Sequence, residues 1–245
     1  MRIAVAGGTG VVGRLVAEHA RAAGHDVVVM ARSRSVDLTT GVGVDDALRG
    51  VDAVIDVTNL MTVSRTAAVR FFETTTRILL EAEKRAGVGH HVLLSIVGVD
   101  RVDWGYYEGK RRQEELVLAG PVPATVLRAT QFHEFAEQSL ERVPGPVAVM
   151  PAMRSRPVAA DEVAAELVRL AEGPAQGLAT DIAGPEVLEM SSAMRRLTRA
   201  RGIRKLVLRV PLPTAAGRAM ARGGMLPTGD FRRGEVTFDR WAGRR

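Results

Sequence analysis

The sequence predicts an α/β fold built on a parallel sheet, and two observations support this. Short apolar runs rich in β-branched residues alternate with longer helix-compatible stretches, a pattern typical of βαβ units. The first run, residues 2–6, leads directly into a glycine-rich turn and then into a stretch, residues 14–23, without helix breakers. We therefore expect a doubly wound parallel sheet with helices on both faces.

The individual elements follow from the same alternation. Strands are expected at residues 2–6, 26–31, 53–57, 91–96 and 124–127, with helices at residues 13–23, 65–86 and 106–119. The connection after the second strand is short, because only three residues separate Arg32 from Val36. Residues 36–38 resemble a brief extra strand, but a full crossover helix cannot fit before them. We interpret this segment as a truncated connection with a short helix at residues 45–49.

The glycine-rich turn fits two nucleotide-binding spacings. Gly8, Gly10 and Gly13 match G-x-G-x-x-G, and Gly7, Gly10 and Gly13 match the wider G-x-x-G-x-x-G. In such a turn the chain leaves a parallel strand and enters a helix whose free N–H groups point at a pyrophosphate. Side chains in the turn would block the phosphate or hold the helix away from the strand. An ordinary strand–turn–helix is the alternative. We predict a Rossmann-like dinucleotide site made by the whole turn: Gly7, Gly8, Thr9, Gly10, Val11, Val12 and Gly13.

The rest of the chain is less regular. A helix is expected at residues 161–172, strands at residues 179–182 and 205–210, and a further helix at residues 191–201. We expect residues 1–150 to form the dinucleotide-binding domain and residues 151–245 to form a small C-terminal α/β lobe that packs on the substrate side.

Composition excludes several classes of function. The 245 residues include no cysteine, so disulfides, thiolate catalysis and cysteine metal sites are excluded. The net charge is +6, but the basic residues are scattered and are not interleaved with aromatic ones, which argues against nucleic-acid binding. No apolar run approaches the ~20 residues of a membrane span. No leader precedes the first strand, so we expect a cytoplasmic protein that does not bind membranes.

The type of cofactor is indicated by the end of the second strand. An acidic residue that binds the ribose 2′-hydroxyl of NAD is expected there, but Arg32 stands in its place, followed by Ser33 and Arg34. A guanidinium binds a 2′-phosphate by two charge-assisted hydrogen bonds, and a serine adds a third. We predict NADP(H). The alternative is that both arginines are solvated loop residues.

Three residues predict the chemistry. Ser95 ends the strand expected at residues 91–96, and Tyr106 and Lys110 follow four residues apart, on one face of a helix. A lysine ammonium lowers the pKa of a nearby tyrosine, which then exchanges a proton with a carbonyl oxygen as hydride is transferred. Ser95 would orient that carbonyl. The alternative makes Tyr106 a core aromatic residue and Lys110 a solvated one.

Neighbouring side chains give weaker signals. Tyr107 competes with Tyr106 for the acid role, since a shift of one residue in the helix start would exchange them. Trp104 either walls the substrate pocket or anchors its loop, and His133 either lines the pocket or belongs to an amphipathic surface helix. His90 and His91 are interpreted as a loop edge before a buried strand. No spacing of acidic and histidine residues predicts a metal site.

These motifs together resemble the atypical, NmrA-like branch of the short-chain dehydrogenases/reductases, from residue 1 to about residue 170. The resemblance implies that Thr58 and Asn59 lie near the adenine ribose and that Asp37 and Leu38 lie against the adenine. The deletion of the second crossover helix is a departure from the family and weakens the transfer of those adenine contacts to this chain. The segments that carry the resemblance are the glycine turn, Ala31-Arg32-Ser33, Asp56-Val57-Thr58-Asn59, Leu94-Ser95-Ile96-Val97-Gly98, Tyr106-Tyr107-Glu108-Gly109-Lys110, Leu127-Arg128-Ala129-Thr130-Gln131-Phe132 and Arg156-Pro157-Val158-Ala159.

The resemblance also implies that Thr130, Gln131 and Phe132 lie near the nicotinamide, with Thr130 contacting the cofactor and Gln131 and Phe132 the substrate. We expect an NADPH-dependent oxidoreductase that reduces a small ketone, quinone or related carbonyl compound. Epimerase or dehydratase chemistry on the same residues is an alternative. Another is a redox sensor without catalysis, because some members of this branch lack the tyrosine. The helix at residues 65–86 is a candidate homodimer contact.

Overall fold

The predicted α/β fold with a parallel central sheet is present in the computed structural model, which describes residues 1–243. Contacts divide the chain into two compact units. Unit 1 comprises Met1–Ser95, Trp104–Arg128 and Asp161–Ala179, and unit 2 comprises Ile96–Asp103, Ala129–Ala160 and the chain from Thr180 onward. The boundary expected after residue 150 stays a prediction.

The sheet of unit 1 confirms the five expected strands, with ends that differ by one or two residues. Its strands are β1 (Arg2–Ala6), β2 (Asp26–Met30), β3 (Ala53–Asp56), β4 (His90–Ile96) and β5 (Ala124–Ala129), and the short β8 (Gly177–Leu178) pairs with β5. Their order is β5-β4-β3-β1-β2. Because β1 lies between β2 and β3, the chain reverses its direction across the sheet after β2. Such a reversal opens a crevice at the carboxyl ends of β1 and β3, and α/β proteins bind ligands in a crevice of this kind.

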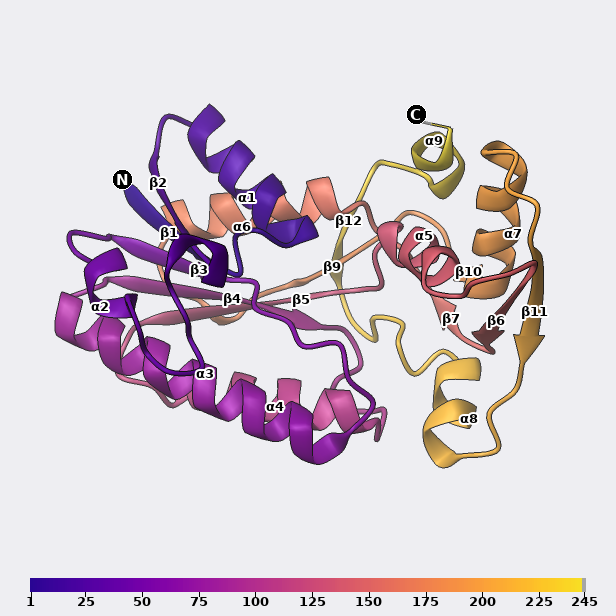
Figure 1. Ribbon diagram of the computed structural model, residues 1–245, viewed down its shortest axis with the longest axis horizontal. Coiled ribbons are helices and arrows are strands. Elements are labelled where there is room, and N and C mark those ends of the chain that lie inside the picture. Colours follow the sequence, from indigo (N-terminus) through magenta and orange to yellow (C-terminus); the bar gives the residue numbers. More distant parts are fainter. Residues whose placement is uncertain (244–245) are drawn as a thin grey trace. The chain divides into compact units, whose positions relative to one another are not determined.

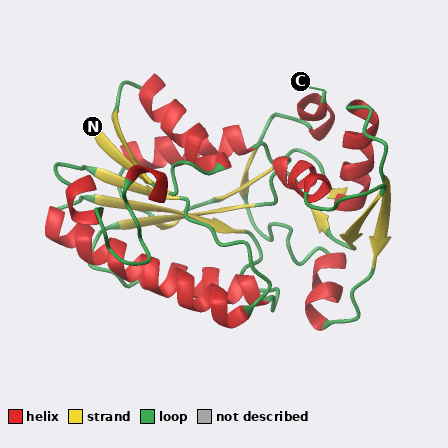
Figure 2. Cartoon of the chain, in the orientation of Figure 1, coloured by secondary structure: helices red, strands yellow, loops and turns green. Residues whose placement is uncertain are grey.

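Helices cover both faces of this sheet. Figure 1 shows α1 (Val11–Ala22) and α6 (Ala160–Glu172) on one face and α3 (Arg65–Ala86) and α4 (Gly105–Leu118) on the other. The same two helical layers are coloured red in Figure 2. The first layer is tied together by two histidine–carboxylate contacts of 2.8 Å, from His19 to Asp161 and from His25 to Glu172.

The connection between β2 and β3 is truncated, as the sequence predicts, and the brief extra strand that residues 36–38 resemble does not form. Asp37 forms only an isolated bridge with Val42 there, between the 3-10 turn η1 (Arg32–Arg34) and the short helix α2 (Val44–Ala47). Apolar side chains of the connection pack into the core in place of a crossover helix, beside Ala6, Met30, Val54 and Leu79. They are Val36, Leu38, Val44, Leu48 and Val51.

Helix α3 has the bounds that the sequence predicts. Ser64 caps its start, because its hydroxyl oxygen accepts a hydrogen bond from the Ala67 amide at 3.3 Å. Gly87 ends it in the left-handed conformation, with a φ of 73°.

No helix among residues 1–243 combines the length and the apolar sequence that a membrane crossing needs.

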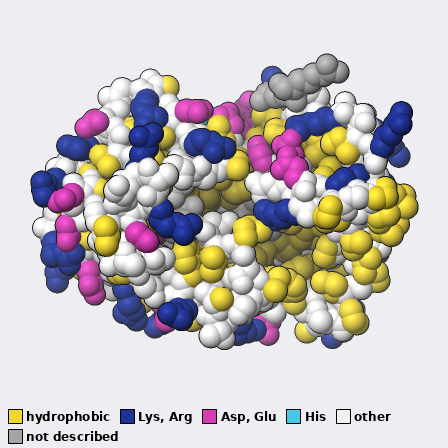
Figure 3. Space-filling view, in the orientation of Figure 1, with side chains coloured by type: hydrophobic (Ala, Val, Ile, Leu, Met, Phe, Trp, Pro, Cys, Tyr) yellow, Lys and Arg dark blue, Asp and Glu magenta, His cyan; other side chains and the backbone are white. Residues whose placement is uncertain are grey.

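Unit 2 contains the remaining elements. Its helices are α5 (Glu134–Glu141), α7 (Met190–Ala200), α8 (Ala215–Ala221) and α9 (Phe238–Ala242), and its strands are β6 (Val147–Pro151), β7 (Arg154–Ser155), β9 (Asp181–Ala183), β10 (Leu188–Glu189), β11 (Leu206–Val210) and β12 (Phe231–Arg233). The parallel pair β6–β11 exposes apolar side chains, visible in yellow over these strands at the right of Figure 3. These are Val147, Val149, Leu206, Leu208 and Val210.

Candidate cofactor-binding and catalytic site

The glycine turn joins β1 to α1 at the carboxyl edge of the sheet, and close contacts explain its glycines. A Cβ atom on Gly13 would lie 2.3 Å from the Gly7 carbonyl oxygen, and one on Gly8 would lie 2.9 Å from the Val5 carbonyl oxygen. Gly7 has a φ of 78°, which favours glycine. The turn therefore holds the helix directly against the strand.

The turn also presents unpaired donors at the start of α1. The Arg14 amide donates to the Gly10 carbonyl at 3.0 Å, which is the first intrahelical bond. The amides of Val11, Val12 and Gly13 come before it and have no helical acceptor. Together with the positive end of the helix dipole, they fit a pyrophosphate. The residues present thus fit a dinucleotide.

The residues that follow β2 are exposed and basic. Arg32, Ser33 and Arg34 form the 3-10 turn, and none of the three is buried. Asp37 accepts hydrogen bonds from the amide and the hydroxyl of Thr39, and these bonds hold the pKa of its carboxyl below the ordinary value. Leu38 is buried in the core cluster. The roles predicted for these residues toward a cofactor stay predictions.

Tyr106 lies near the start of α4, and its hydroxyl donates a hydrogen bond of 2.7 Å to Asn59 Oδ1. Asn59 follows β3 and accordingly comes from the carboxyl edge of the sheet. The Tyr106 ring also packs edge-on against Phe72 of α3, with ring centres 5.8 Å apart. The contacts of Tyr106 thus direct its hydroxyl toward the loop after β3.

Lys110 is buried one helical turn further along α4. Its ammonium donates to the Leu94 carbonyl at 2.7 Å and to Gln113 Oε1 at 2.5 Å, and it lies 5.0 Å from the centre of the Phe72 ring. Leu94 immediately precedes Ser95 in β4. The ammonium is therefore anchored beside the predicted serine through the backbone.

Two buried hydroxyl groups at this edge have no hydrogen-bond partner within residues 1–243. They are Ser95 Oγ, in a residue only 2% exposed, and Thr58 Oγ1. Buried hydroxyls are normally paired, so these two are available to a ligand or a water molecule. Ser95 lies at the end of β4 and Thr58 follows β3, and these two strands are parallel neighbours in the sheet.

Burial controls the protonation of the tyrosine and the lysine. It raises the pKa of Tyr106 above the ordinary value, so the lysine does not lower that pKa in this arrangement. Burial also lowers the pKa of Lys110 to about 8, although the nearby carboxylates of Asp56 and Glu114 work in the opposite direction. Both groups are thereby biased toward their neutral forms.

The histidines at the start of β4 lie inside the strand, so their interpretation as a loop edge is wrong. His90 contacts the Thr125 hydroxyl at 2.9 Å, and His91 Nδ1 contacts both carboxylate oxygens of Glu83 at 2.8 and 3.0 Å. Burial opposes the charge on His91, but Glu83 outweighs it and raises the pKa. No group of three side chains suited to a metal ion occurs among the residues that the structure describes.

Trp104 and Tyr107 are placed beside the predicted acid. Trp104 precedes α4, and its carbonyl accepts from the Tyr107 amide at 2.8 Å. The Tyr107 side chain is only 4% exposed, whereas Tyr106 is half-buried. This difference in exposure favours Tyr106 over Tyr107 as the residue that meets a substrate.

Four predicted residues belong to unit 2. The Thr130 hydroxyl donates to the Arg156 carbonyl, and Phe132 pairs with Val158 in an isolated bridge. His133 is buried and packs against Phe238 and Trp241, with ring centres 5.2 and 5.6 Å apart. Gln131 contributes its carbonyl to the Val158 amide. Their predicted substrate and cofactor roles stay predictions.

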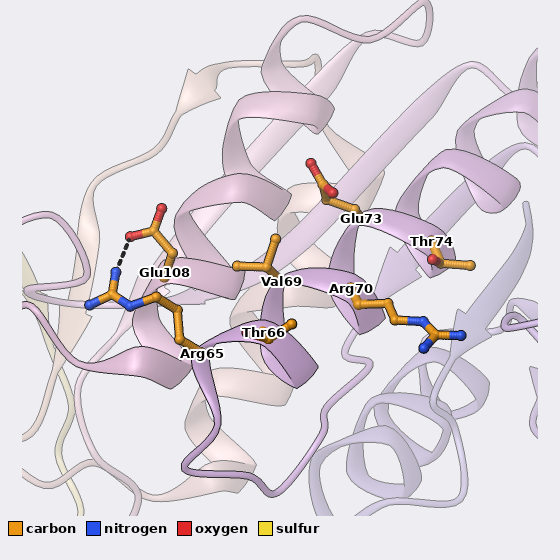
Figure 4. A pocket seen from close by; sticks show the side chains of 7 residues that line it. All are labelled: Arg65, Thr66, Val69, Arg70, Glu73, Thr74 and Glu108. Atoms are coloured by element: carbon orange, nitrogen blue, oxygen red, sulfur yellow. Dashed lines mark hydrogen bonds and ion pairs between the residues drawn. The ribbon is translucent and has the colours of Figure 1, made fainter.

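A surface hollow of about 500 Å³ lies along the first turns of α3. Figure 4 shows Arg65 of α3 paired with Glu108 of α4 at its edge, at 3.0 Å, while Arg70 points away from this pair. No residue of the predicted site lines it, so this hollow is not the nucleotide site. Its lining residues are Arg65, Thr66, Val69, Arg70, Glu73, Thr74 and Glu108.

Sequence reasoning missed Gln113 and assigned no role to Asp56. Gln113 Nε2 donates to Asp56 Oδ2 at 2.9 Å, while its oxygen accepts from Lys110. The only signal in the sequence is that Gln113 lies three residues after Lys110 and hence on the same face of the helix.

Residues 7–174 match the model of a family described as NAD(P)H-binding, which is more than half of the chain. No curated protein matches the sequence.

Solved structures share the fold over nearly the whole chain. A nucleoside-diphosphate-sugar epimerase from Staphylococcus aureus has a TM-score of 0.75 at 15% identity and covers 100% of both chains. A short-chain dehydrogenase/reductase superfamily protein from Agrobacterium tumefaciens with bound NAD has a TM-score of 0.70 at 18% identity, with 99% and 95% covered. The NADPH-dependent quinone oxidoreductase QOR2 of Escherichia coli, in complex with NADPH, has a TM-score of 0.72 at 18% identity, with 98% of both chains covered. The family match confirms the predicted NAD(P)H-binding domain, and these structures share its fold.

Proposed function

We propose that this chain, which belongs to the NAD(P)H-binding family, is an oxidoreductase that uses NADPH to reduce a small ketone, quinone or related carbonyl compound. One observation carries this proposal. The Tyr106 hydroxyl, the unpartnered Ser95 hydroxyl and the Lys110 ammonium all belong to unit 1, which also contains the glycine turn. The similarity to a quinone oxidoreductase supports the reaction class.

The cofactor would be held by the residues whose geometry fits a dinucleotide. The turn Gly7–Gly13 would bind the pyrophosphate through its amides, and Arg32, Ser33 and Arg34 would bind a 2′-phosphate. Thr58 and Asn59 would contact the ribose. When bound, NADPH supplies a hydride. The presence of the exposed Arg32 where an acidic residue is expected at the end of β2 supports the phosphorylated cofactor over NADH.

The chain's own residues would act on the carbonyl oxygen of the substrate. As the carbonyl carbon is reduced, the Tyr106 hydroxyl gives its proton to that oxygen, and the product is an alcohol or hydroquinone. The Ser95 hydroxyl donates a hydrogen bond to the same oxygen. Burial raises the pKa of Tyr106, so its hydroxyl carries a proton at neutral pH and has that proton to give.

A nucleotide sensor without catalysis is the second candidate. It is supported by the hydrogen bond that the Tyr106 hydroxyl already makes to Asn59 and by its raised pKa, which opposes the tyrosinate form. In that case the chain binds NADPH and NADP⁺ differently and passes this difference to a partner protein.

Steady-state NADPH oxidation over a panel of quinones and ketones tests the proposal, with Tyr106→Phe and Tyr107→Phe as a matched pair. We expect Tyr106→Phe to lose turnover by about 10²-fold or more while it still binds NADPH. Tyr107→Phe should retain most of the activity. If the wild type binds NADPH and oxidises it with no member of the panel, the sensor is favoured. If Tyr107→Phe alone is inactive, the acid is Tyr107.

A further inference from the structure

A hydrogen-bonded chain of buried groups runs from the loop after β3 to the ammonium of Lys110. The Thr58 amide donates to Asp56 Oδ1 at 2.8 Å, and Gln113 Nε2 donates to Asp56 Oδ2 at 2.9 Å. Gln113 Oε1 then accepts from Lys110 Nζ at 2.5 Å, and Lys110 also donates to the Leu94 carbonyl. The chain thus connects three separate elements: β3, α4 and β4.

Each member of this chain is buried. Gln113 is fully buried, Asp56 is 1% exposed and Lys110 is 3% exposed. Buried carboxylates and ammonium groups are costly unless they are hydrogen-bonded. An amide is the side-chain group that accepts from the ammonium with its oxygen and donates to the carboxylate with its nitrogen at the same time. A glutamine between Asp56 and Lys110 therefore satisfies both charges without bringing them into direct contact.

The same loop also holds the tyrosine. Asn59 follows Thr58 directly, and its side-chain oxygen accepts from the Tyr106 hydroxyl at 2.7 Å. The loop after β3 consequently binds both ends of the Tyr106–Lys110 pair, one directly and the other through Asp56 and Gln113.

We propose that Asp56 and Gln113 are positioning residues, which fix the Lys110 ammonium beside Ser95 and keep it in register with Tyr106. The proposal rests on the proposed function for its catalytic consequence. All of the residues involved belong to unit 1. Neither residue touches the reacting atoms, so each acts through Lys110.

The charged groups that act on Lys110 come from three elements. They are Asp56 of β3, Glu114 of α4 and His91 of β4, and His91 is itself paired with Glu83 of α3. Glu114 is held separately by Arg128, at 2.7 Å. A variant that tests Lys110 should therefore leave the charges of Asp56, Glu114 and His91 unchanged, or should move one of these charges to a known position.

A reciprocal exchange provides such a change. In the double variant Asp56→Asn/Gln113→Glu, the new amide at position 56 donates to the new carboxylate at position 113, which still accepts from Lys110. The hydrogen-bond chain and the total charge are retained, but the negative charge moves one side chain closer to the ammonium. Each single variant breaks the chain, because Gln113→Glu places two carboxylates together, and Asp56→Asn removes the charge and turns an amide NH2 group toward Gln113 Nε2, which is itself a donor.

The first readout is independent of activity. The chain has three lysines, Lys84, Lys110 and Lys205, so lysine labelled with ¹³C at Cε gives three resolvable NMR signals, assigned with Lys110→Arg. We expect the Lys110 signal to titrate at a lower pH than the other two. The midpoint should fall in Gln113→Leu and rise above the wild-type value, by about one pH unit or more, in the double variant.

The second readout is the pH profile of kcat and KM in the NADPH assay. Gln113→Leu should lower kcat by about tenfold or more while KM for NADPH changes by less than about threefold. The double variant should recover most of kcat, with its profile displaced to higher pH. Glu115→Gln, an exposed change on the same helix, is the control and should match the wild type.

The two readouts separate the two claims. The positioning role is overturned if Lys110 titrates at the same pH in the wild type and in the folded double variant. It is also overturned if the wild type is active and the double variant folds but does not recover kcat. If the Lys110 midpoints move as expected but the wild type reduces no carbonyl compound, the positioning stands and the proposed function fails. If Gln113→Leu does not fold, the double variant alone decides, because it retains volume and charge.

Discussion

The glycine turn and the start of α4 both belong to the predicted site of unit 1, but different forces shape them. Close contacts define the turn, where a Cβ on Gly13 would lie 2.3 Å from a backbone oxygen. Hydrogen bonds define the helix end, where Tyr106 depends on Asn59 and Lys110 depends on Leu94 and Gln113. The steric contacts of Gly13 act between residues close in sequence, whereas the hydrogen bonds to Asn59 and Leu94 join residues 47 and 16 positions apart.

The steric claim is tested most strongly at Gly13. Gly13→Ala should destabilise the protein by about 3 kcal/mol or more and abolish NADPH binding, because neither the Gly7 carbonyl nor Gly8 can move without opening the turn. Urea unfolding and NADPH titration measure both effects. The control is Gly229→Ala, because nothing lies within 4 Å of a Cβ at that position. Tight NADPH binding by Gly13→Ala would contradict the steric account.

A smaller effect is expected at Arg32, in the 3-10 turn that follows β2. Arg32→Asp should weaken NADPH binding by about 2 to 3 kcal/mol and leave NADH binding nearly unchanged, since the charged hydrogen bonds serve only the 2′-phosphate. Calorimetric titration of both cofactors measures the ratio. Arg21→Asp, the same change of charge at the end of α1, should leave the ratio as it is. Equal affinity of the wild type for NADH and NADPH would refute the phosphate role.

The smallest predicted effect concerns the buried lysine. The pKa of Lys110 is about 8 in the folded chain and about 10.4 when unfolded, so between these values the unfolded state binds more protons. Stability from this group therefore rises with pH, by about 2 kcal/mol between pH 7.5 and 9.5. Lys110→Met removes this rise. Unfolding free energies of both proteins across that range give the slope, and equal slopes would show that Lys110 is not desolvated.

The elements of the fold that were predictable carry local signals. Helix α3 has its expected bounds because Ser64 and Gly87 mark its two ends. The strands of unit 1 follow from continuous apolar runs buried on both faces. Residues 36–38 resemble a strand because Val36 and Leu38 alternate with Asp37, but the short spacing predicts the truncated connection that the structure has, with both apolar side chains in the core.

The site was predictable in its parts but not in its connections. The spacing of Tyr106 and Lys110 indicates a shared helix face, yet Lys110 turns to Leu94 and Gln113, because the buried ammonium must be satisfied by the nearest acceptors. Gln113 carries no motif of its own. His91 was misplaced for the same reason, since its partner Glu83 lies on another element, α3.

The most direct test of the central claim is the single-turnover rate at which bound NADPH is oxidised by a quinone that the wild type reduces, measured for the wild type and Tyr106→Phe. The account predicts that Tyr106→Phe binds NADPH within about twofold of the wild-type affinity and oxidises it about 10²–10⁴-fold more slowly. A Tyr106→Phe rate within about threefold of the wild-type rate would contradict it.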